Sequence, residues 1–132
     1  MSALSYTAMG TETVLLADDN PHIRRIIRDI LDMSGYTVIE AVDGKDGLER
    51  FIEYQDSVTL LVLDIDMPRK NGRKAYEEIR EIRPDIKVIF ISGRAREAAL
   101  GGWGRNIINI EYLSKPFLPK ELLQKIRKML DE

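Results

Sequence analysis

Five polar residues with side chains suited to phosphate and metal chemistry each follow or end an apolar run. They are Asp18 and Asp19 after the first run, Asp64 at the third, Ser92 at the fourth and Lys115 at the fifth. Carboxylates that lie close together repel one another and raise each other's pKa unless a cation lies between them. Mg²⁺ binds one or two carboxylates together with waters and a phosphate oxygen. The pattern therefore predicts a magnesium site where Asp64 attacks a phosphoryl group and where Ser92 and Lys115 bind its remaining oxygens.

Each of these residues has a simpler interpretation when it is considered alone. A carboxylate at the end of a strand is commonly a helix cap or a turn former. The prediction of a shared site depends on a fold that brings all five side chains to one edge of a sheet.

Five apolar runs alternate with amphipathic segments, as expected for strands that alternate with helices. The strands are predicted at residues 13–18, 36–41, 59–64, 87–92 and 111–115. Alternating strands and helices indicate an α/β fold with a parallel sheet, right-handed crossovers and helices on both faces. Five strands favour a flavodoxin-like doubly wound sheet in the order 2-1-3-4-5, although sequence alone does not fix the order. Ligands bind such sheets outside the carboxyl ends of the strands.

Apolar spacing predicts the helices between these strands. After Pro21, one stripe with helical spacing is expected to be buried, and Gly35 ends that helix. The stripe consists of Ile23, Ile26, Ile27, Ile30 and Leu31. The other helices lie around 48–52, 75–82 and 122–130. The segment 94–106 contains three glycines, so its helix should be short and frayed or end near Leu100.

Composition limits the classes of function. The chain has no cysteine, so a disulfide framework or a thiolate metal site is excluded. Its 20 basic and 22 acidic residues give a formal net charge of -2, which offers no electrostatic case for nucleic acid or an anionic membrane. No apolar run approaches the roughly 18 to 20 residues of a membrane span. We expect a cytoplasmic protein with one domain at 13–132 after an N-terminal extension or linker at 1–12.

Four motifs give the chain a specific family resemblance. "LLADDN", "LDIDMPRKNG", "FISG" and "YLSKPF" occur in the order and at about the spacing found in receiver domains of two-component response regulators. The chain therefore resembles a CheY-like receiver domain, which implies that Asp64 is the phosphoacceptor. The resemblance also implies that Asp18, Asp19 and the backbone carbonyl of Asp66 join Asp64 in holding Mg²⁺. Lys115 would then bind the phosphoryl group.

The resemblance also implies a switch and partners. Ser92 and Tyr112 match the family's switch pair, in which the hydroxyl moves to the phosphoryl group and the aromatic side chain turns inward. The expected partner is a histidine kinase or a phosphotransfer protein, without direct contact to nucleic acid or membrane. Such a domain is not an enzyme beyond catalysing its own phosphorylation and dephosphorylation. A weak homodimer through the fourth helix, fifth strand and fifth helix remains open.

The two ends of the chain are similar to those of receivers fused behind the kinase core of hybrid histidine kinases. "GTETVLLADDN" begins the domain and "LSKPFLPKELLQKIRKMLDE" closes it. We therefore favour a receiver of a hybrid kinase, with a stand-alone receiver as the alternative.

Asp66 and Arg94 are an unusual combination at two positions that vary within the family. Both flank the expected path to the phosphate, and we predict that they pair and set how long the phosphoryl group survives. The alternative is that both are solvated charges, because an exposed pair is usually worth only about 0 to 1 kcal/mol.

His22 and Trp103 are not expected in the site, and two other protein families share some of these features. His22, the only histidine, is expected to be exposed in a first helical turn. Without a second histidine, the phosphodonor is expected to be another chain or a small molecule. Trp103 is expected to fold onto the fourth helix. A haloacid-dehalogenase-type phosphatase would also use an Asp-x-Asp strand end and Mg²⁺, but its motifs occur in a different order. A flavodoxin-like nucleotide binder would need a glycine-rich phosphate loop after the first strand, and none is present.

Overall fold

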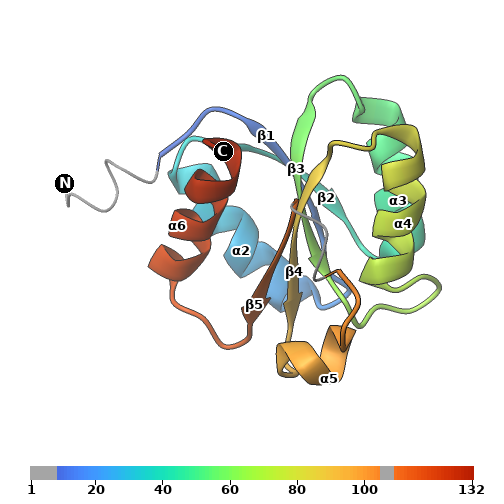
Figure 1. Cartoon of the computed structure of the whole chain (residues 1–132). Helices are drawn as coiled ribbons and strands as arrows, with labels where there is room; N and C mark the ends of the chain where they lie inside the picture. The colour runs from blue at the N-terminus through green and yellow to red at the C-terminus, as the bar shows by residue number, and fades with distance from the viewer. Residues whose placement is uncertain (1–8, 105–108) are drawn as a thin grey trace.

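The sheet is parallel and lies between two layers of helices (Figure 1). The computed structural model describes residues 9–104 and 109–132. Its strands are β1 (Thr13–Ala17), β2 (Thr37–Ala41), β3 (Val58–Asp64), β4 (Lys87–Ser92) and β5 (Ile110–Ser114). Its helices are α2 (Pro21–Met33), α3 (Gly44–Tyr54), α4 (Gly72–Ile82), α5 (Arg96–Leu100) and α6 (Pro119–Leu130). The strand order is β2-β1-β3-β4-β5 with parallel pairing throughout, which confirms the predicted fold class and order.

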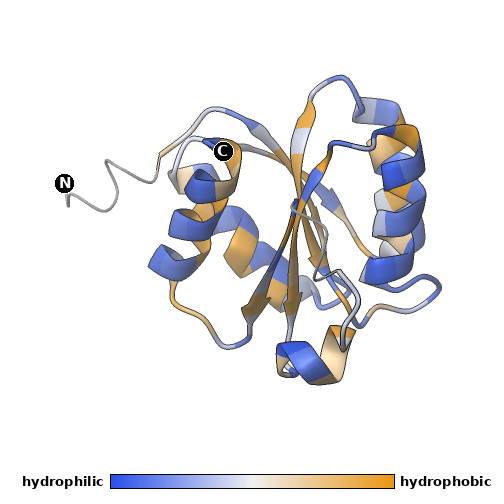
Figure 2. Ribbon diagram, viewed as in Figure 1, coloured by the Kyte–Doolittle hydropathy of each residue, from blue (hydrophilic) through white to orange (hydrophobic). Residues whose placement is uncertain are grey.

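Each face of the sheet has its own hydrophobic core. Leu61 and Leu63 of β3 pack in the core under α3, α4 and α5, whereas Leu60 and Val62 pack in the core under α2 and α6. This alternation follows from the two-residue period of a strand. Because both faces are covered, the middle of each central strand is apolar, as the hydrophobic colour there shows (Figure 2). Polar residues of these strands therefore concentrate at their ends.

Three helices begin at the carboxyl edge of the sheet with a side chain that caps the first turn. Asn20 accepts hydrogen bonds from the backbone N–H groups that follow it at the start of α2. Asp43 caps α3 and Asn71 caps α4 in the same way. Gly72 lets α4 start against the end of β3, because a Cβ atom there would lie 2.2 Å from the carbonyl oxygen of Asp64. The loop after Asp64 is thus held close to the sheet edge.

The apolar stripe of α2 is only partly buried, so the prediction of one buried stripe was wrong in part. Ile27 and Leu31 are fully packed in the core, but Ile26 is 47% exposed. Ile23 and Ile30 are half-buried. A helix that lies on a sheet buries only the residues directly above the strands, so the flank of a wide stripe can remain at the surface.

The short helix α5 and the residues after it pack against α4 and β4. Helix α5 ends at Leu100, as predicted, and Gly101 follows it with φ +58°. The Trp103 ring makes edge-to-face contacts with Tyr76 and Phe90, with centroids 6.0 and 5.7 Å away. These ring contacts are with α4 and β4, and Trp103 belongs to the same hydrophobic core as Ala99 and Leu100 of α5. The rest of the predicted segment 94–106, from residue 105 on, lies outside the described residues.

Residues 9–12 contact the C-terminal helix. The guanidinium of Arg127 binds the Glu12 carboxylate at 2.7 Å and the Met9 carbonyl at 3.3 Å. Residues 1–8 of the predicted extension lie outside the described residues, and the boundary at residue 13 stays a prediction. Within the described ranges, every helix is too short or too polar to cross a membrane.

Candidate phosphoacceptor site

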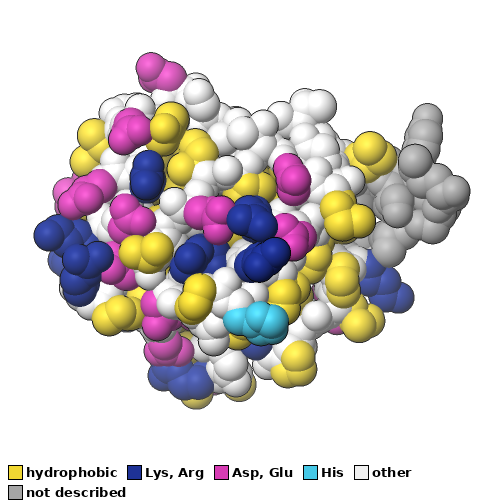
Figure 3. All heavy atoms as spheres, turned by 180° about the vertical axis from the view of Figure 1, so that it is seen from behind, with side chains coloured by type: hydrophobic (Ala, Val, Ile, Leu, Met, Phe, Trp, Pro, Cys, Tyr) yellow, Lys and Arg dark blue, Asp and Glu magenta, His cyan; other side chains and the backbone are white. Residues whose placement is uncertain are grey.

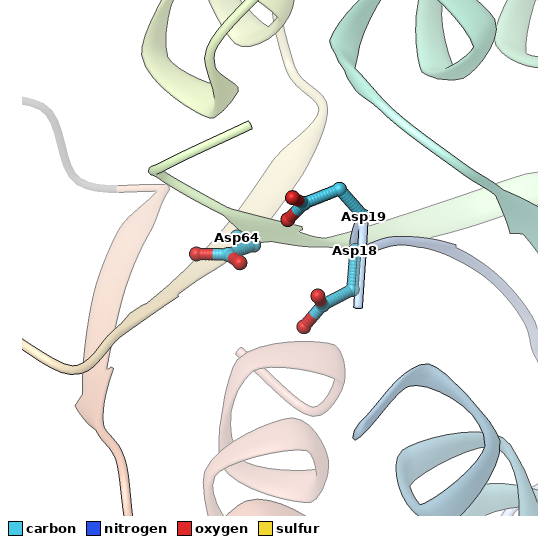
Figure 4. A group of neighbouring side chains, drawn as sticks. All are labelled: Asp18, Asp19 and Asp64. Atoms are coloured by element: carbon cyan, nitrogen blue, oxygen red, sulfur yellow. The ribbon is translucent and has the colours of Figure 1, made fainter. Parts of the chain in front are cut away.

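The carboxyl ends of β1, β3 and β5 bring four predicted site residues together. Asp18 and Asp19 follow β1, Asp64 ends β3, and Lys115 follows β5. One carboxylate oxygen from each aspartate lies within 4.8 Å of the others (Figure 4). The Lys115 ammonium lies 3.2 Å from Asp18 and 3.3 Å from Asp64. The sheet topology therefore assembles the predicted cluster of acidic and basic groups.

Burial and a neighbouring negative charge destabilise the charged form of the Asp64 carboxylate. The residue is only 5% exposed. Burial raises its pKa, the neighbouring charge of Asp18 raises it further, and the attraction of Lys115 only partly compensates, leaving the pKa at about 6. A cation bound beside Asp64 would therefore stabilise its charged form.

Lys115 experiences the opposite balance. Burial lowers the pKa of its ammonium, but the charges and hydrogen bonds of Asp18 and Asp64 outweigh this and raise the pKa above its ordinary value. The side chain is therefore cationic at neutral pH and is held between the two carboxylates.

Asp18 and Asp19 differ in exposure although they are adjacent. Asp18 is completely buried, and its Oδ1 accepts a hydrogen bond from the Asn20 N–H at 2.9 Å. Asp19 is exposed. Arg24 supports this turn by donating to the Asp18 backbone carbonyl at 2.8 Å. Sequence reasoning missed Arg24, because the available signal, a basic residue one turn into the helix after the acidic pair, is common on solvated helix faces.

Ser92 lies at the same edge, but its hydroxyl is directed to Asp66. The Ser92 Oγ donates to an Asp66 carboxylate oxygen at 3.2 Å, and Arg94 binds the same carboxylate at 2.7 Å. The Tyr112 hydroxyl donates to the backbone carbonyl of Arg94. The predicted pairing of Asp66 with Arg94 is thus present in the structure. The predicted effect of the pair on the lifetime of a phosphoryl group stays a prediction.

The donor set of this edge fits Mg²⁺. Asp18, Asp19 and Asp64 offer hard oxygen ligands within reach of one another, and together they carry more negative charge than Lys115 neutralises. The raised pKa of Asp64 reports the same excess of negative charge. No sulfur or imidazole ligand belongs to this cluster of described residues, so softer transition metals are less suited to it.

Comparisons with known proteins identify the relatives of this chain. The family model described as the response regulator receiver domain matches residues 14–127. The sensor kinase CckA of Brucella abortus is 36% identical over 126 residues, which cover 93% of this chain and 13% of that kinase. The chain spans between 13% and 50% of the length of such curated relatives.

Solved structures agree with the sequence matches. A response regulator receiver domain protein from Clostridium thermocellum superposes with a TM-score of 0.83 at 26% identity, over 91% of this chain and 94% of that one. The response regulator protein TrrA from Thermotoga maritima, crystallised with Mg²⁺ and BeF, superposes with a TM-score of 0.76 at 30% identity, over 89% of this chain and 98% of that one. The haloacid-dehalogenase alternative is not supported by these matches.

Proposed function

This chain belongs to the response regulator receiver domain family, and on that premise we propose that it accepts a phosphoryl group on Asp64 and changes conformation to signal. The observation that carries the proposal is the buried Asp64 carboxylate, which lies against Asp18 and the Lys115 ammonium at the carboxyl edge of the sheet. A carboxylate with an unfavourable charged form and a neighbouring ammonium is suited to attack an electrophilic phosphorus.

In the transfer step, a carboxylate oxygen of Asp64 forms a bond to phosphorus. The phosphorus–nitrogen bond of a phosphohistidine breaks, or the phosphorus–oxygen bond of an acyl phosphate, and the bonding electrons leave with the donor. The Lys115 ammonium stabilises the negative charge on the transferred oxygens. No oxidation or reduction occurs, and the product is a mixed anhydride on Asp64.

We propose that Asp18, Asp19, Asp64 and the backbone carbonyl of Asp66 hold Mg²⁺ in this reaction. When bound, the ion supplies positive charge that offsets the charge of the carboxylates and of the phosphoryl oxygens. The Asp64 carboxylate is held through both of its oxygens, because Oδ1 accepts a hydrogen bond from the Asp66 backbone N–H at 3.2 Å and Oδ2 accepts one from the Lys115 ammonium at 3.3 Å.

The donor is proposed to be a histidine kinase or a phosphotransfer protein. His22 is the only histidine among these 132 residues and lies exposed at the start of α2, on the surface shown in Figure 3. We therefore propose that the phosphohistidine lies outside these residues, in a kinase or phosphotransfer segment. An apolar groove of about 380 Å³ begins at Lys115 and runs along α2, where Ile26 lies between Ile23 and Ile30. This groove adjoins the phosphoacceptor site, so a donor helix that docks there would bring its histidine toward Asp64.

Labelling with a small acyl phosphate tests the proposal. Acetyl phosphate and Mg²⁺ should add one phosphoryl group to the wild-type chain, detected by intact mass. Asp64→Asn and addition of EDTA should each abolish labelling, whereas Asp56→Asn, which changes an exposed aspartate after α3, should not. Equal labelling of Asp64→Asn would contradict the proposal. Steady hydrolysis of many unrelated phosphate esters would instead indicate a phosphatase.

A further inference from the structure

Asp66 makes hydrogen bonds with three residues at the site, Asp64, Ser92 and Arg94. Its backbone N–H donates to the Asp64 carboxylate at 3.2 Å. Its own carboxylate accepts the Ser92 hydroxyl at 3.2 Å and binds the Arg94 guanidinium through two nitrogens, at 2.7 and 3.3 Å. Asp66 thus connects the proposed phosphoacceptor with the end of β4 and with the loop between β4 and α5.

The Ser92 hydroxyl can serve only one acceptor at a time. A serine hydroxyl has one proton to donate, and here that proton goes to Asp66 while the Oγ atom accepts the Arg94 N–H at 3.1 Å. Ser92 is fully buried, so water does not readily replace a lost partner. Donation to a phosphoryl oxygen on Asp64 and donation to Asp66 therefore exclude each other.

Arg94 extends this network to α5 and β5. Its Nη1 donates to the backbone carbonyl of Ala98 in α5 at 3.1 Å. Its own backbone carbonyl accepts the hydroxyl of Tyr112, which lies on β5. A change at the Asp66 carboxylate would therefore alter contacts of α5 as well as of Ser92.

We propose that the Asp66 carboxylate is a latch, defined as the group that holds the Ser92 hydroxyl and the Arg94 guanidinium in the unphosphorylated state. A phosphoryl group on Asp64 must displace Asp66 from Ser92 to gain that hydrogen bond, and the displacement releases Arg94 from its carboxylate partner. Asp66 is a positioning residue that acts through Ser92. The inference rests on the proposed function of Asp64 and deepens it, because it names the competitor of the phosphoryl group.

A second mechanism for Asp66 must be separated from the latch. The Asp66 carboxylate could act on the phosphoryl group through charge repulsion alone, without any role for Ser92. The Asp66 and Arg94 side chains are 55% and 47% exposed, so their ion pair is screened and does not by itself distinguish the two mechanisms. The buried hydroxyl of Ser92 does distinguish them, because only the latch requires it.

A double-mutant cycle on beryllofluoride binding separates the mechanisms. Beryllofluoride with Mg²⁺ stands in for the phosphoryl group, and the apparent dissociation constant is measured for the whole chain. Asp66→Ala should tighten binding by about fivefold, since the Ser92 hydroxyl is then free to donate to the ligand. In the Ser92→Ala background the same substitution should change binding by less than about twofold. Equal tightening in both backgrounds would overturn the latch and leave charge repulsion as the cause.

Hydrogen exchange of the ligand-free protein gives a second readout. Asp66→Ala should speed exchange of the Ala99 and Gly101 amides, which close the turns of α5, because Arg94 loses the carboxylate that holds it near Ala98. Asp85→Ala removes an exposed carboxylate at the other end of β4 and should leave these amides unchanged. Unchanged exchange in Asp66→Ala would also overturn the latch.

The control for the premise is the wild-type chain itself. If it does not bind beryllofluoride with Mg²⁺ at all, the proposed function fails and the latch fails with it. If it binds but the cycle is additive, the phosphoacceptor proposal stands and only the latch is overturned.

Discussion

Asp64 combines a buried carboxylate with a neighbouring carboxylate of the same charge, and this combination has an energetic cost in the absence of a cation. Burial and the charge of Asp18 raise its pKa from 3.8 to about 6 despite the nearby Lys115. A carboxyl group with a raised folded-state pKa binds protons more tightly in the folded state than in the unfolded state. Folding stability therefore decreases as pH rises from 3.8 to about 6 and stays reduced above it.

Asp64→Asn should consequently stabilise the protein when divalent cations are absent. In EDTA at pH 7, the free energy of unfolding of the variant should exceed that of wild type by about 1 to 3 kcal/mol. The difference should shrink as pH falls from about 6 to 3.8, and urea denaturation at several pH values measures it. Asp56→Asn is the matched control, and a destabilised Asp64→Asn protein would show that the charged form of Asp64 is favourable.

The contacts of Asp66 illustrate what sequence could and could not predict at the scale of residues. Its place after β3 and its pairing with Arg94 follow from the strand ends, which a buried apolar run defines well. Its hydrogen bond with Ser92 depends on the rotamers of two side chains that are 26 positions apart in sequence. Periodicity carries no information on such rotamers, so this contact was not predicted.

Among the helices and strands, α2 is the one whose predicted burial differs from the structure in a way that bears on function. Its apolar spacing correctly indicated a helix packed on the sheet, with Ile27 and Leu31 in the core. The same spacing could not show that Ile26 lies outside the contact with the sheet, because that depends on the rotation of the helix about its axis. The exposed flank of the stripe, together with Phe117 after β5, forms the proposed docking groove for the donor.

Ile26→Ala should therefore weaken phosphotransfer from a protein donor without affecting the chemistry at Asp64. The rate of transfer from a phosphorylated histidine phosphotransfer protein that labels wild type should fall about tenfold, which corresponds to about 1.4 kcal/mol. Labelling by acetyl phosphate should be unchanged. Ile52→Ala is the control, since Ile52 is similarly exposed at 49% but lies on α3 across the sheet. Equal losses in both variants would argue against the groove.

At the scale of the whole molecule, Arg127 connects the C-terminal helix to residues near the start of the described chain, and no local sequence pattern indicates these contacts. Arg127 of α6 binds Glu12, the backbone of Met9 and the hydroxyl of Tyr36. The pairing of Arg127 with Glu12 joins positions 115 apart in sequence, so only the folded topology reveals it. The order of the strands was predicted because five alternating strands favour one of the common doubly wound arrangements, whereas long-range ion pairs follow no such common pattern.

Glu12→Gln tests the ion pair between Glu12 and Arg127 through the pH dependence of folding stability. The hydrogen bonds from Arg127 lower the pKa of Glu12 from 4.5 to about 2. A lowered folded-state pKa adds stability that is present above pH 4.5 and is lost as pH falls from 4.5 toward 2. Because the pair is partly solvated, we expect Glu12→Gln to lower the free energy of unfolding by about 1 kcal/mol at pH 7.

The comparison of Glu12→Gln with wild type by urea denaturation should show this difference disappear toward pH 2. Glu81→Gln changes an exposed glutamate of α4 and is the matched control. A constant difference across the acidic range would mean that Glu12 contributes through packing instead of charge.

Chemical identification of the phosphorylated residue tests whether Asp64 is the phosphoacceptor. The wild-type chain is treated with acetyl phosphate and Mg²⁺, the acyl phosphate is reduced with borohydride, and peptides are sequenced by mass spectrometry. Reduction converts a phosphorylated aspartate to homoserine, so we expect homoserine at position 64 and unmodified aspartate at positions 18, 19 and 66. Homoserine at one of those three positions, or a stable phosphate on a hydroxyl, would contradict the assignment of Asp64 as the phosphoacceptor.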